Sequence, residues 1–222
     1  MTARYRERPW KGISFLVLDE AGVTIADDSL VRIPYRLPDG RTFRERFIAA
    51  NGRTWWGPGS QLIPLGLETL PSQEKASRSA LFVAEGESDT LAIREAFAEP
   101  SAGNPITAYY ALGLPGAGTW RPDWALIVED FNVIYLLGDG DAAGRRMIEA
   151  VHRDLPWARP VWLPDGEDAR SILQTQGPRA LDPYLDRADE VARLCVALFA
   201  AESYEDFVRL MGGGRAVTRA TA

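Results

Sequence analysis

Short apolar runs alternate with longer mixed segments through the second half of the chain. Four runs are apolar on both faces: LFVA (81–84), ITAYYAL (106–112), VIYLL (133–137) and PVWLP (160–164). Segments with helical periodicity separate them, the clearest at 88–97 and 142–152 and a short one beginning near Asp168. Fully apolar strands that alternate with helices are typical of a parallel sheet covered by helices. We therefore predict an α/β fold for this half.

The first 70 residues show a different pattern, with short strand candidates separated by turns. FLVL (15–18), VRIPYR (31–36) and the alternating run at 41–50 are predicted strands, with turns at PDG (38–40) and WWGPGS (55–60). The neighbouring Trp55 and Trp56 are predicted to straddle a small sheet, one ring facing the core and one facing out. The alternative is that they stack on single-stranded bases.

These patterns predict four parts. Residues 1–75 form a small, basic, mostly β subdomain, 80–178 the α/β domain, 179–211 a C-terminal helical extension and 212–222 a flexible tail. The polar stretch 71–79 lacks periodicity and is predicted to be a linker. In the helical extension, Val191, Leu194 and Leu198 share one stripe, and Cys195 beside it is predicted to lie in the core.

Composition narrows the function classes. The 222 residues are 46% hydrophobic and 25% charged, which is ordinary for a globular protein. No apolar run is long enough for a membrane helix, and the N-terminus lacks the apolar stretch of a signal peptide, so we expect a cytoplasmic protein, in the host cytoplasm if phage-encoded. A single cysteine and a single histidine exclude a disulfide framework and a Cys/His zinc site. Any metal must be held mainly by oxygen.

Charge is distributed unevenly along the chain. The formal net charge is −6, yet residues 1–53 hold ten Lys or Arg against seven Asp or Glu. A basic front and an acidic remainder suit an enzyme that binds polyanions at one end and metal ions at the other. Ordinary scatter of surface charge explains the same numbers equally well.

Acidic residues follow two of the predicted strands. Glu85 and Asp89 come after the first strand of the α/β half, and Asp139 and Asp141 come after the third. The carboxyl ends of parallel strands meet at one edge of a sheet, where ligands usually bind. Several carboxylates there repel one another unless a cation such as Mg²⁺ offsets their charge. Taken singly, each motif is explained as well by turn formation or helix capping.

Longer motifs around these acids resemble a known family. VAEGESDTLAIREAF (83–97) and LLGDGDAAGRRMIEAV (136–151) resemble the two motifs of the Toprim domain, which primases share with topoisomerases. LPDGEDARSIL (163–173) resembles the third acidic patch of primases. Upstream, RIPYRLPDG (32–40), RERF (44–47) and GSQLIPLGLETL (59–70) resemble the amino-terminal part of primase polymerase domains. The Glu-Gly-Glu-x-Asp spelling at 85–89 is nearest to bacteriophage-type primase-helicases.

The resemblance implies both a fold and an activity. It implies a Toprim sheet with flanking helices, preceded by a small β-rich subdomain and followed by helices. It also implies a Mg²⁺-dependent primase-like nucleotidyltransferase, with Mn²⁺ as an alternative ion and no zinc. Its substrates are a single-stranded DNA template and nucleoside triphosphates, its setting is phage or mobile-element replication, and its expected partner is a helicase on a separate chain, with no membrane involved.

The resemblance also assigns residue roles. The implied catalytic residues are Glu85, Asp139 and Asp141, and the implied metal ligands are Glu85, Asp89, Asp139, Asp141 and Asp168. Template or triphosphate would be bound by Arg32, Arg36, Arg44, Arg46 and Arg53, since guanidinium groups pair well with phosphate. Arg46 is the favoured one. For each arginine, a solvated position on a strand is an equally good interpretation.

Three departures from the family pattern keep other functions open. The chain cannot build the zinc module of known primases, it has no helicase P-loop, and Arg170 stands where bacterial primases usually have an acid. The first alternative is a Toprim nuclease that hydrolyses phosphodiesters. The second is a non-catalytic DNA-binding or replication-complex module. The basic front and the third patch favour polymerisation over hydrolysis, and the retained acids argue against a mere scaffold.

Overall fold

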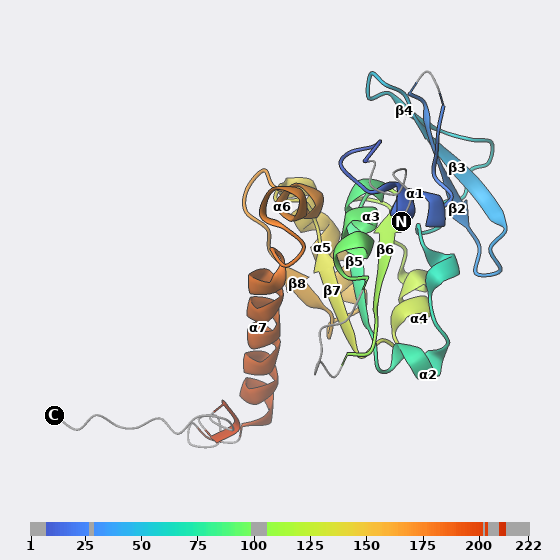
Figure 1. Ribbon diagram of the computed structural model, residues 1–222. Helices are drawn as coiled ribbons and strands as arrows, with labels where there is room; N and C mark the ends of the chain where they lie inside the picture. Colours follow the sequence, from blue (N-terminus) through green and yellow to red (C-terminus); the bar gives the residue numbers. More distant parts are fainter. Residues whose placement is uncertain (1–7, 27–28, 99–105, 202, 204–208, 212–222) are drawn as a thin grey trace.

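The structure is a computed structural model that describes residues 8–26, 29–98, 106–201, 203 and 209–211. A parallel four-stranded sheet forms its centre, with the strand order β6-β5-β7-β8 (Figure 1). The strands are β5 (Ala80–Glu85), β6 (Tyr109–Leu114), β7 (Val133–Leu137) and β8 (Arg159–Val161). The predicted α/β class, with a Toprim-like parallel sheet, is confirmed.

Helices cover both faces of this sheet. One face packs against α3 (Glu87–Ala96), α6 (Ala169–Gln176) and α7 (Asp182–Ala200), around Phe82 and Tyr135. The other packs against α4 (Ala125–Val128), α5 (Ala142–Asp154) and the short α2 (Gln73–Ala76), around Val83 and Leu136. The 3₁₀ turns η2 (Leu67–Thr69) and η3 (Pro122–Trp124) add Leu67 and Trp124 to this second layer. Because helices bury both faces, every residue of β7 is apolar and buried.

A second sheet lies beside the first and is antiparallel. It has the order β1-β2-β3-β4, formed by β1 (Thr24–Ile25), β2 (Val31–Arg36), β3 (Thr42–Ile48) and β4 (Thr54–Trp56). The predicted mostly β amino-terminal region is therefore present. Trp55 and Trp56 belong to β4 and not to the predicted turn, and they straddle the sheet as expected, with Trp55 exposed and Trp56 half-buried.

Three local predictions were wrong. FLVL (15–18) forms the first turn of helix α1 (Phe15–Glu20), because burial of Val17 and Leu18 needs only one helical face. The stretch 71–79, predicted to be a linker, contains α2, and Ala76 is buried in the core of the parallel sheet. Cys195 is exposed on α7, whose buried residues are Leu185, Ala188 and Ala197.

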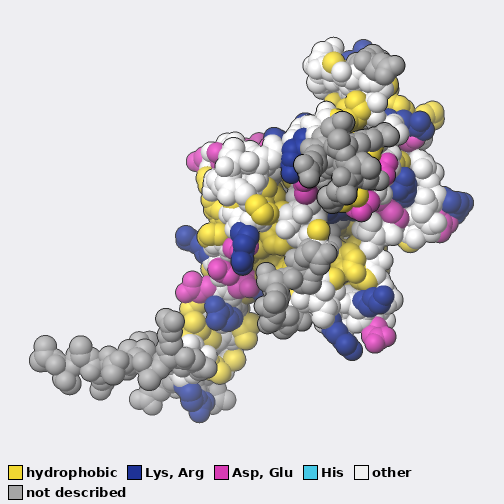
Figure 2. Space-filling model, in the orientation of Figure 1, with side chains coloured by type: hydrophobic (Ala, Val, Ile, Leu, Met, Phe, Trp, Pro, Cys, Tyr) yellow, Lys and Arg dark blue, Asp and Glu magenta, His cyan; other side chains and the backbone are white. Residues whose placement is uncertain are grey.

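The stripe predicted on α7 is also not the packed face, since Val191 and Leu198 are exposed. Hydrophobic side chains are visible along this helix in Figure 2. The predicted tail, 212–222, lies outside the described residues, and the four-part division of the chain stays a prediction. Among the described residues, no helix is long and apolar enough to cross a membrane.

A shared core joins the two sheets. Leu91 of α3 is fully buried among Ile13, Ile33 and Tyr35 from the amino-terminal region. Next to it, the backbone N–H groups of Leu65 and Gly113 donate to each other's carbonyls at 2.8 and 2.9 Å, which ties the segment after β4 to β6. The position of the antiparallel sheet is thus fixed by packing against the helix that follows Glu85.

We expect Leu91→Ala to lower the free energy of unfolding by about 2–5 kcal/mol, because it leaves a cavity between the two sheets. Urea denaturation followed by circular dichroism measures this loss. Leu126→Ala is the matched control, since Leu126 is 71% exposed and should change stability by less than ~0.5 kcal/mol. Equal stability of the two variants would show that the junction contributes little to folding.

Candidate functional site

Two predicted catalytic acids lie at the same edge of the parallel sheet. Glu85 is the last residue of β5, and Asp139 follows β7 by two residues; the strands are neighbours, with Ala84 opposite Leu137. Gly144 in the first turn of α5 packs directly against Asp139. A Cβ at Gly144 would lie 2.4 Å from the backbone nitrogen of Asp139, so only glycine allows the helix to begin this close to it.

Glu85 and Asp139 are half-buried, and neither forms an ion pair among the residues that the structure describes. Burial raises the pKa of Glu85 and the charges of Asp141 and Asp89 raise it further, whereas a hydrogen bond from the backbone of Asp139 and the charge of Arg146 oppose the rise. Burial, together with the charges of Asp89, Glu85, Asp168 and Asp141, raises the pKa of Asp139 to about 7. The structure therefore brings the five predicted acids close enough together for each of the other four to act on Asp139.

Asp141 has a structural role. Its Oδ1 accepts hydrogen bonds from the backbone N–H groups of Ala143 and Gly144, at 2.7 and 2.8 Å, and so caps α5. The hydrogen bond from Gly144 contributes most to lowering the pKa of Asp141, and the bond from Ala143 and the charges of Arg145 and Arg146 add to it, so that together they outweigh desolvation. Asp141 is therefore ionised and directed at the start of its own helix, where negative charge is favourable.

Asp89 and Asp168 are joined through Arg170. The backbone N–H of Arg170 donates to Asp89 at 2.9 Å, and its guanidinium donates to Asp168, also at 2.9 Å. Asp168 also caps α6 through the backbone N–H of Ser171. Burial raises the pKa of Asp89, although the Arg170 hydrogen bond opposes the rise. Arg170, which departs from the family pattern, thus supplies the positive charge for this pair.

The five acids consequently differ in how free they are to bind a metal. Within the described residues, no group of three or more His, Cys, Asp or Glu side chains is arranged so that it could hold a metal ion. Glu85 nevertheless has a buried carboxylate oxygen, Oε2, with no hydrogen-bond partner in the described structure. Mg²⁺ is commonly held by one or two carboxylates, with water and substrate phosphate completing its shell. Glu85 and Asp139 fit such a site.

Arg44 and Arg46 lie on the face of the antiparallel sheet that points towards α3. Both guanidinium groups lie over the Trp56 ring, at 5.1 and 4.7 Å from its centroid. Arg44 donates to the carbonyls of Gly57 and Gln61 at 3.0 and 3.1 Å. Arg46 donates to Thr54 Oγ1 at 2.8 Å. Both predicted phosphate-binding arginines are therefore also part of the packing of this sheet.

The other three arginines differ from one another. Arg32 forms an ion pair with Glu45 across β2 and β3, donating from Nε at 2.6 Å. Arg36 lies against Gly22, where any Cβ would collide with its guanidinium. Arg53 lies over the Trp55 ring at 5.3 Å from its centroid and is exposed. Arg53 is the one with the clearest access to an outside ligand.

Two residues outside the predicted set take part in the site. Glu87 accepts a hydrogen bond from the Tyr35 hydroxyl at 2.8 Å and pairs with Arg46 at 3.8 Å, linking the antiparallel sheet to the start of α3. Lys11 adopts a left-handed φ of 45° and donates to Ser88 Oγ at 3.2 Å. The second Glu of the Glu-Gly-Glu motif was the available signal for Glu87. Lys11 stands outside every motif, so no sequence signal pointed to it.

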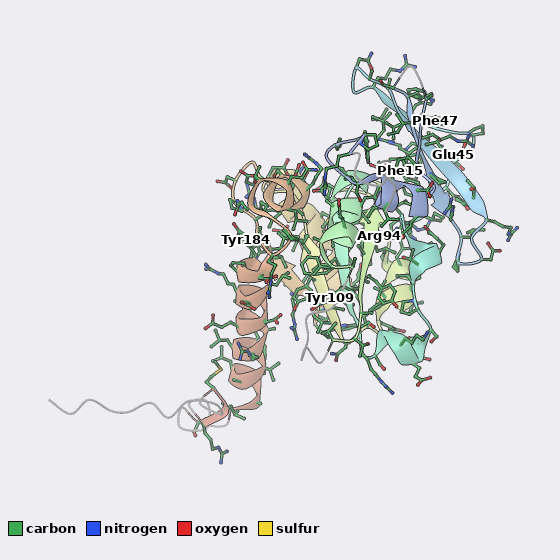
Figure 3. The ribbon with its side chains drawn as sticks, viewed as in Figure 1. Phe15, Glu45, Phe47, Arg94, Tyr109 and Tyr184 are labelled. Atoms are coloured by element: carbon green, nitrogen blue, oxygen red, sulfur yellow. The ribbon has the colours of Figure 1, made fainter. Side chains whose placement is uncertain are left out.

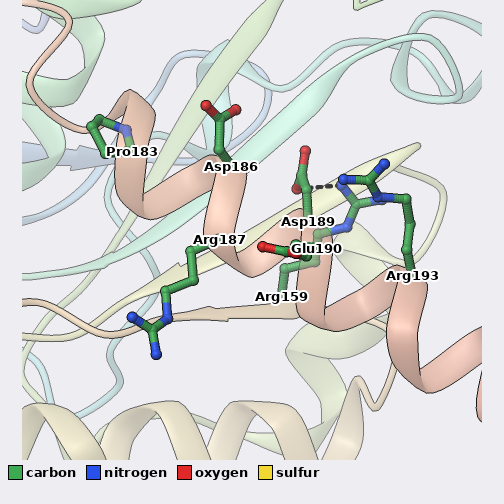
Figure 4. Close-up of a pocket in the computed structure, with 7 residues that line it drawn as sticks. All are labelled: Arg159, Pro183, Asp186, Arg187, Asp189, Glu190 and Arg193. Atoms are coloured by element: carbon green, nitrogen blue, oxygen red, sulfur yellow. Dashed lines mark hydrogen bonds and ion pairs between the residues drawn. The ribbon is translucent and has the colours of Figure 1, made fainter. Parts of the chain in front are cut away.

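Two surface hollows lie away from this edge of the sheet. One, of about 930 Å³, is lined by Arg159, Asp189 and other charged residues of α7 (Figure 4). The other, of about 1930 Å³, runs between α7 and the Trp157–Trp162 segment. None of the predicted site residues lines either hollow. Asp189 accepts hydrogen bonds from Arg159 and, at 2.9 Å, from Tyr135. The charged residues at the first hollow therefore have a structural role, because they join α7 to the sheet.

Comparison with known proteins agrees with this fold. No protein-family model matches the chain. The gene 57 protein of Mycobacterium phage D29 is 36% identical over 70 residues, which are 32% of this chain and 46% of that protein, so the match spans less than half of the relative.

Solved primase structures are similar over most of the chain. A structure of bacteriophage T7 lagging-strand DNA polymerase with the primase domains of two gp4 subunits, an RNA/DNA hybrid and dTTP matches with TM-score 0.65 and 22% identity, over 82% of this chain and 90% of that one. The primase fragment of the T7 primase-helicase matches with TM-score 0.62 and 20% identity, over 82% and 74%. The DnaG catalytic core matches with TM-score 0.62 and 19% identity, over 92% and 80%. The predicted resemblance to Toprim primases is confirmed for the fold.

The raised pKa of Asp139 predicts how stability depends on pH in the absence of metal. The folded state holds the Asp139 proton up to about pH 7, whereas the ordinary pKa is 3.8, so ionisation costs stability as pH rises between these values. We expect Asp139→Asn to match the wild type near pH 4 and to be more stable at pH 7.5. The gain should be on the order of 1–2 kcal/mol, discounted because the side chain is half-exposed. Thermal melting with a chelator measures it, and a less stable variant at pH 7.5 would make Asp139 a structural residue.

The cap made by Asp141 leads to a separate prediction. Asp141→Asn keeps the side-chain oxygen that caps α5 and should melt close to the wild type, whereas Asp141→Ala should melt several degrees lower. Because the pKa of Asp141 is lowered in the folded state, its contribution is present above the ordinary pKa and is lost as pH falls through the folded value. The difference between wild type and Asp141→Ala should therefore shrink in acid. A difference that stays constant with pH would contradict the role of the ionised cap.

Proposed function

We propose that the protein is a primase-like nucleotidyltransferase that makes or extends primers on single-stranded DNA in phage or mobile-element replication. The observation that carries the proposal is the pair of Glu85 and Asp139, half-buried carboxyl groups with raised pKa values at the carboxyl ends of β5 and β7. The fold of primase catalytic domains around this pair supports the choice of reaction.

Glu85 and Asp139 together are better suited to binding a divalent cation than to binding any other kind of ligand. Two repelling carboxylates with one unpartnered buried oxygen gain most from a small, doubly charged ion that prefers oxygen. We assign Glu85 and Asp139 as the ligands of Mg²⁺ or Mn²⁺. The other three implied ligands, Asp89, Asp141 and Asp168, would act on the ion through their charge without binding it directly. A bound ion of this kind supplies positive charge that stabilises the leaving pyrophosphate.

Glu85 is the candidate general base of the reaction. The 3′-hydroxyl of the primer attacks the α-phosphate of the incoming nucleotide, and the hydroxyl proton passes to a Glu85 carboxylate oxygen. The new bond joins the 3′-oxygen to the α-phosphorus, the bond between the α- and β-phosphates breaks, and pyrophosphate leaves. Burial raises the pKa of Glu85 in the metal-free protein, and a bound cation would lower it again, so the carboxylate would be ionised and able to accept this proton.

The basic side chains next to the acidic edge come from the amino-terminal region. Glu87, two residues after Glu85, binds Arg46 and Tyr35 of the antiparallel sheet. This sheet is therefore held beside the carboxylates. Template and triphosphate are polyanions, and the five arginines of this region supply the complementary charge. One of the similar T7 structures is of a primase-helicase, which supports a helicase as the expected partner of this chain.

The alternative is a Toprim nuclease, because the same carboxylates and metal ion also support phosphodiester hydrolysis. The neighbours of known activity in the comparison are primases, which favours transfer over hydrolysis. A single assay distinguishes the nuclease and the non-catalytic DNA-binding module from the proposed primase.

The test is incorporation of labelled nucleotides on a single-stranded template with Mg²⁺ or Mn²⁺. We expect the wild type to extend primers and Glu85→Gln to lose about 10²–10⁴-fold in rate, as when a general base is removed. Glu149→Gln is the matched control, since Glu149 is exposed on the outer side of α5 and should keep full activity. Shortened template without incorporation would favour the nuclease. Template binding without either product would favour the non-catalytic module.

A further inference from the structure

The outer face of the antiparallel sheet carries a column of stacked side chains that the proposed chemistry does not use. Phe47 on β3 and Trp55 on β4 are directly paired, and their rings stack at a centroid distance of 5.5 Å with an angle of 10°. The Arg53 guanidinium lies over the same Trp55 ring at 5.3 Å. Phe47 is labelled on β3 in Figure 3, within the antiparallel sheet. The Trp55 ring therefore contacts both an aromatic ring and a guanidinium group.

This column is open to solvent. Trp55 is 36% exposed, and Phe47 beside it is half-buried. Strand alternation explains the exposure, because Phe47 and Trp55 point opposite to Arg46 and Trp56, which face α3. In Figure 2, hydrophobic and basic side chains both reach the surface over this sheet. An aromatic ring with this degree of exposure is ordinary on a protein surface, so the case for a ligand rests on the arrangement of Trp55 and Arg53 and not on exposure alone.

Arg53 differs from the arginines on the inner face. Arg44 and Arg46 have hydrogen-bond acceptors in the sheet and the cation–π contact with Trp56, and Arg46 also pairs with Glu87. Among the residues that the structure describes, no carboxylate forms an ion pair with Arg53. Its long side chain is held only by the weak contact with the indole, so it can move aside at little cost. A free guanidinium beside an exposed indole matches the two parts of a nucleotide, which are its phosphate and its base.

We propose that Trp55 and Arg53 bind one nucleotide of a single-stranded DNA, with the base stacked on the indole and the phosphate paired with the guanidinium. The base displaces the guanidinium from the indole ring, and the stacked Phe47 ring holds the indole in place. Flat aromatic surfaces accept any base, so this contact is independent of sequence. The inference rests on the proposed function for its choice of DNA, and it places a template contact on the face of the sheet opposite the Glu87 junction.

Stacked aromatic pairs across two strands also stabilise sheets, and this is the competing explanation of the column. The two explanations differ in what the conservative replacement does. Trp55→Phe keeps an aromatic surface for a base, whereas Trp55→Ala removes it. Trp162 offers a matched control, because it is exposed to a greater degree, 53%, and lies in the other sheet's half of the molecule, directly after β8.

The first experiment measures binding of a fluorescein-labelled oligodeoxythymidylate by anisotropy over a salt series. We expect Trp55→Ala to weaken binding by about 5- to 150-fold, the range for one stacked base, with an unchanged slope of log affinity against log salt. Trp55→Phe should stay within about threefold of the wild type, and Trp162→Ala should be unchanged. Arg53→Gln should reduce the slope by about 0.7, as for one lost phosphate contact on a single strand. Affinity of Trp55→Ala within twofold of the wild type, or an equal loss in Trp162→Ala, would overturn the proposal.

The second experiment uses the wild-type chain and so does not depend on how well the variants fold. An oligonucleotide that carries 5-iodouracil is crosslinked by ultraviolet light, and the modified residue is identified by mass spectrometry. We expect the crosslink at Trp55, and crosslinks confined to other aromatic residues would refute the proposal. The same preparations are assayed for nucleotide incorporation at saturating template. If neither the Trp55 variants nor the crosslinks show a contact at Trp55 but the protein incorporates nucleotides, only this inference is refuted. If Trp55 is crosslinked but no nucleotide is incorporated, only the proposed function is refuted.

Discussion

Repulsion among carboxylates at one edge of the parallel sheet is the constraint on which the rest of the site depends. The structure offsets most of it locally: Arg170 serves Asp89 and Asp168, and the start of α5 serves Asp141. Gly144 allows α5 to approach closely enough for this. Glu85 and Asp139 form no ion pair within the described residues, and burial together with the neighbouring carboxylates raises the pKa of each. Three of the five acids have a partner nearby, and the repulsion between the remaining two, Glu85 and Asp139, would be offset by a cation that binds together with the substrate.

The antiparallel sheet is placed by the same helix that follows Glu85. Leu91 anchors the apolar side of the junction, and Glu87 anchors the polar side through Tyr35 and Arg46. A basic sheet is consequently fixed next to an acidic edge, although the net charge of the chain is negative. The two faces of the antiparallel sheet also differ in what their arginines do. Arginines on the inner face maintain the junction, whereas Arg53 on the outer face is available to a ligand.

Strands and acidic residues that are marked by periodicity and motif spacing were predicted correctly from the sequence. Features that depend on contacts between residues distant in the sequence were not. The apolar runs at 81–84 and 133–137 identified β5 and β7, and the spacing of Glu85 and Asp139 placed both at the carboxyl edge. The run at 15–18 is too short for its period to separate helix from strand, so α1 was missed. The roles of Arg46 and Arg170 depend on Glu87, Asp89 and Asp168, which are distant in sequence, and no local pattern reveals such pairings. The same is true of Cys195, because the face of α7 that packs is set by β8 and the helix itself has apolar residues on more than one side.

The most direct test of the central claim is the melting temperature of the wild-type chain as Mg²⁺ is added to metal-free protein at neutral pH. A cation held between Glu85 and Asp139 binds only the folded state, so stability should rise with the logarithm of the Mg²⁺ concentration once it exceeds the dissociation constant. Glu85→Gln, with one ligand charge removed, should need far more Mg²⁺ for the same rise, and Glu149→Gln should behave as the wild type. A wild-type melting temperature that does not respond to Mg²⁺, or an equal response in Glu85→Gln, would contradict the assignment of these two acids as the metal site.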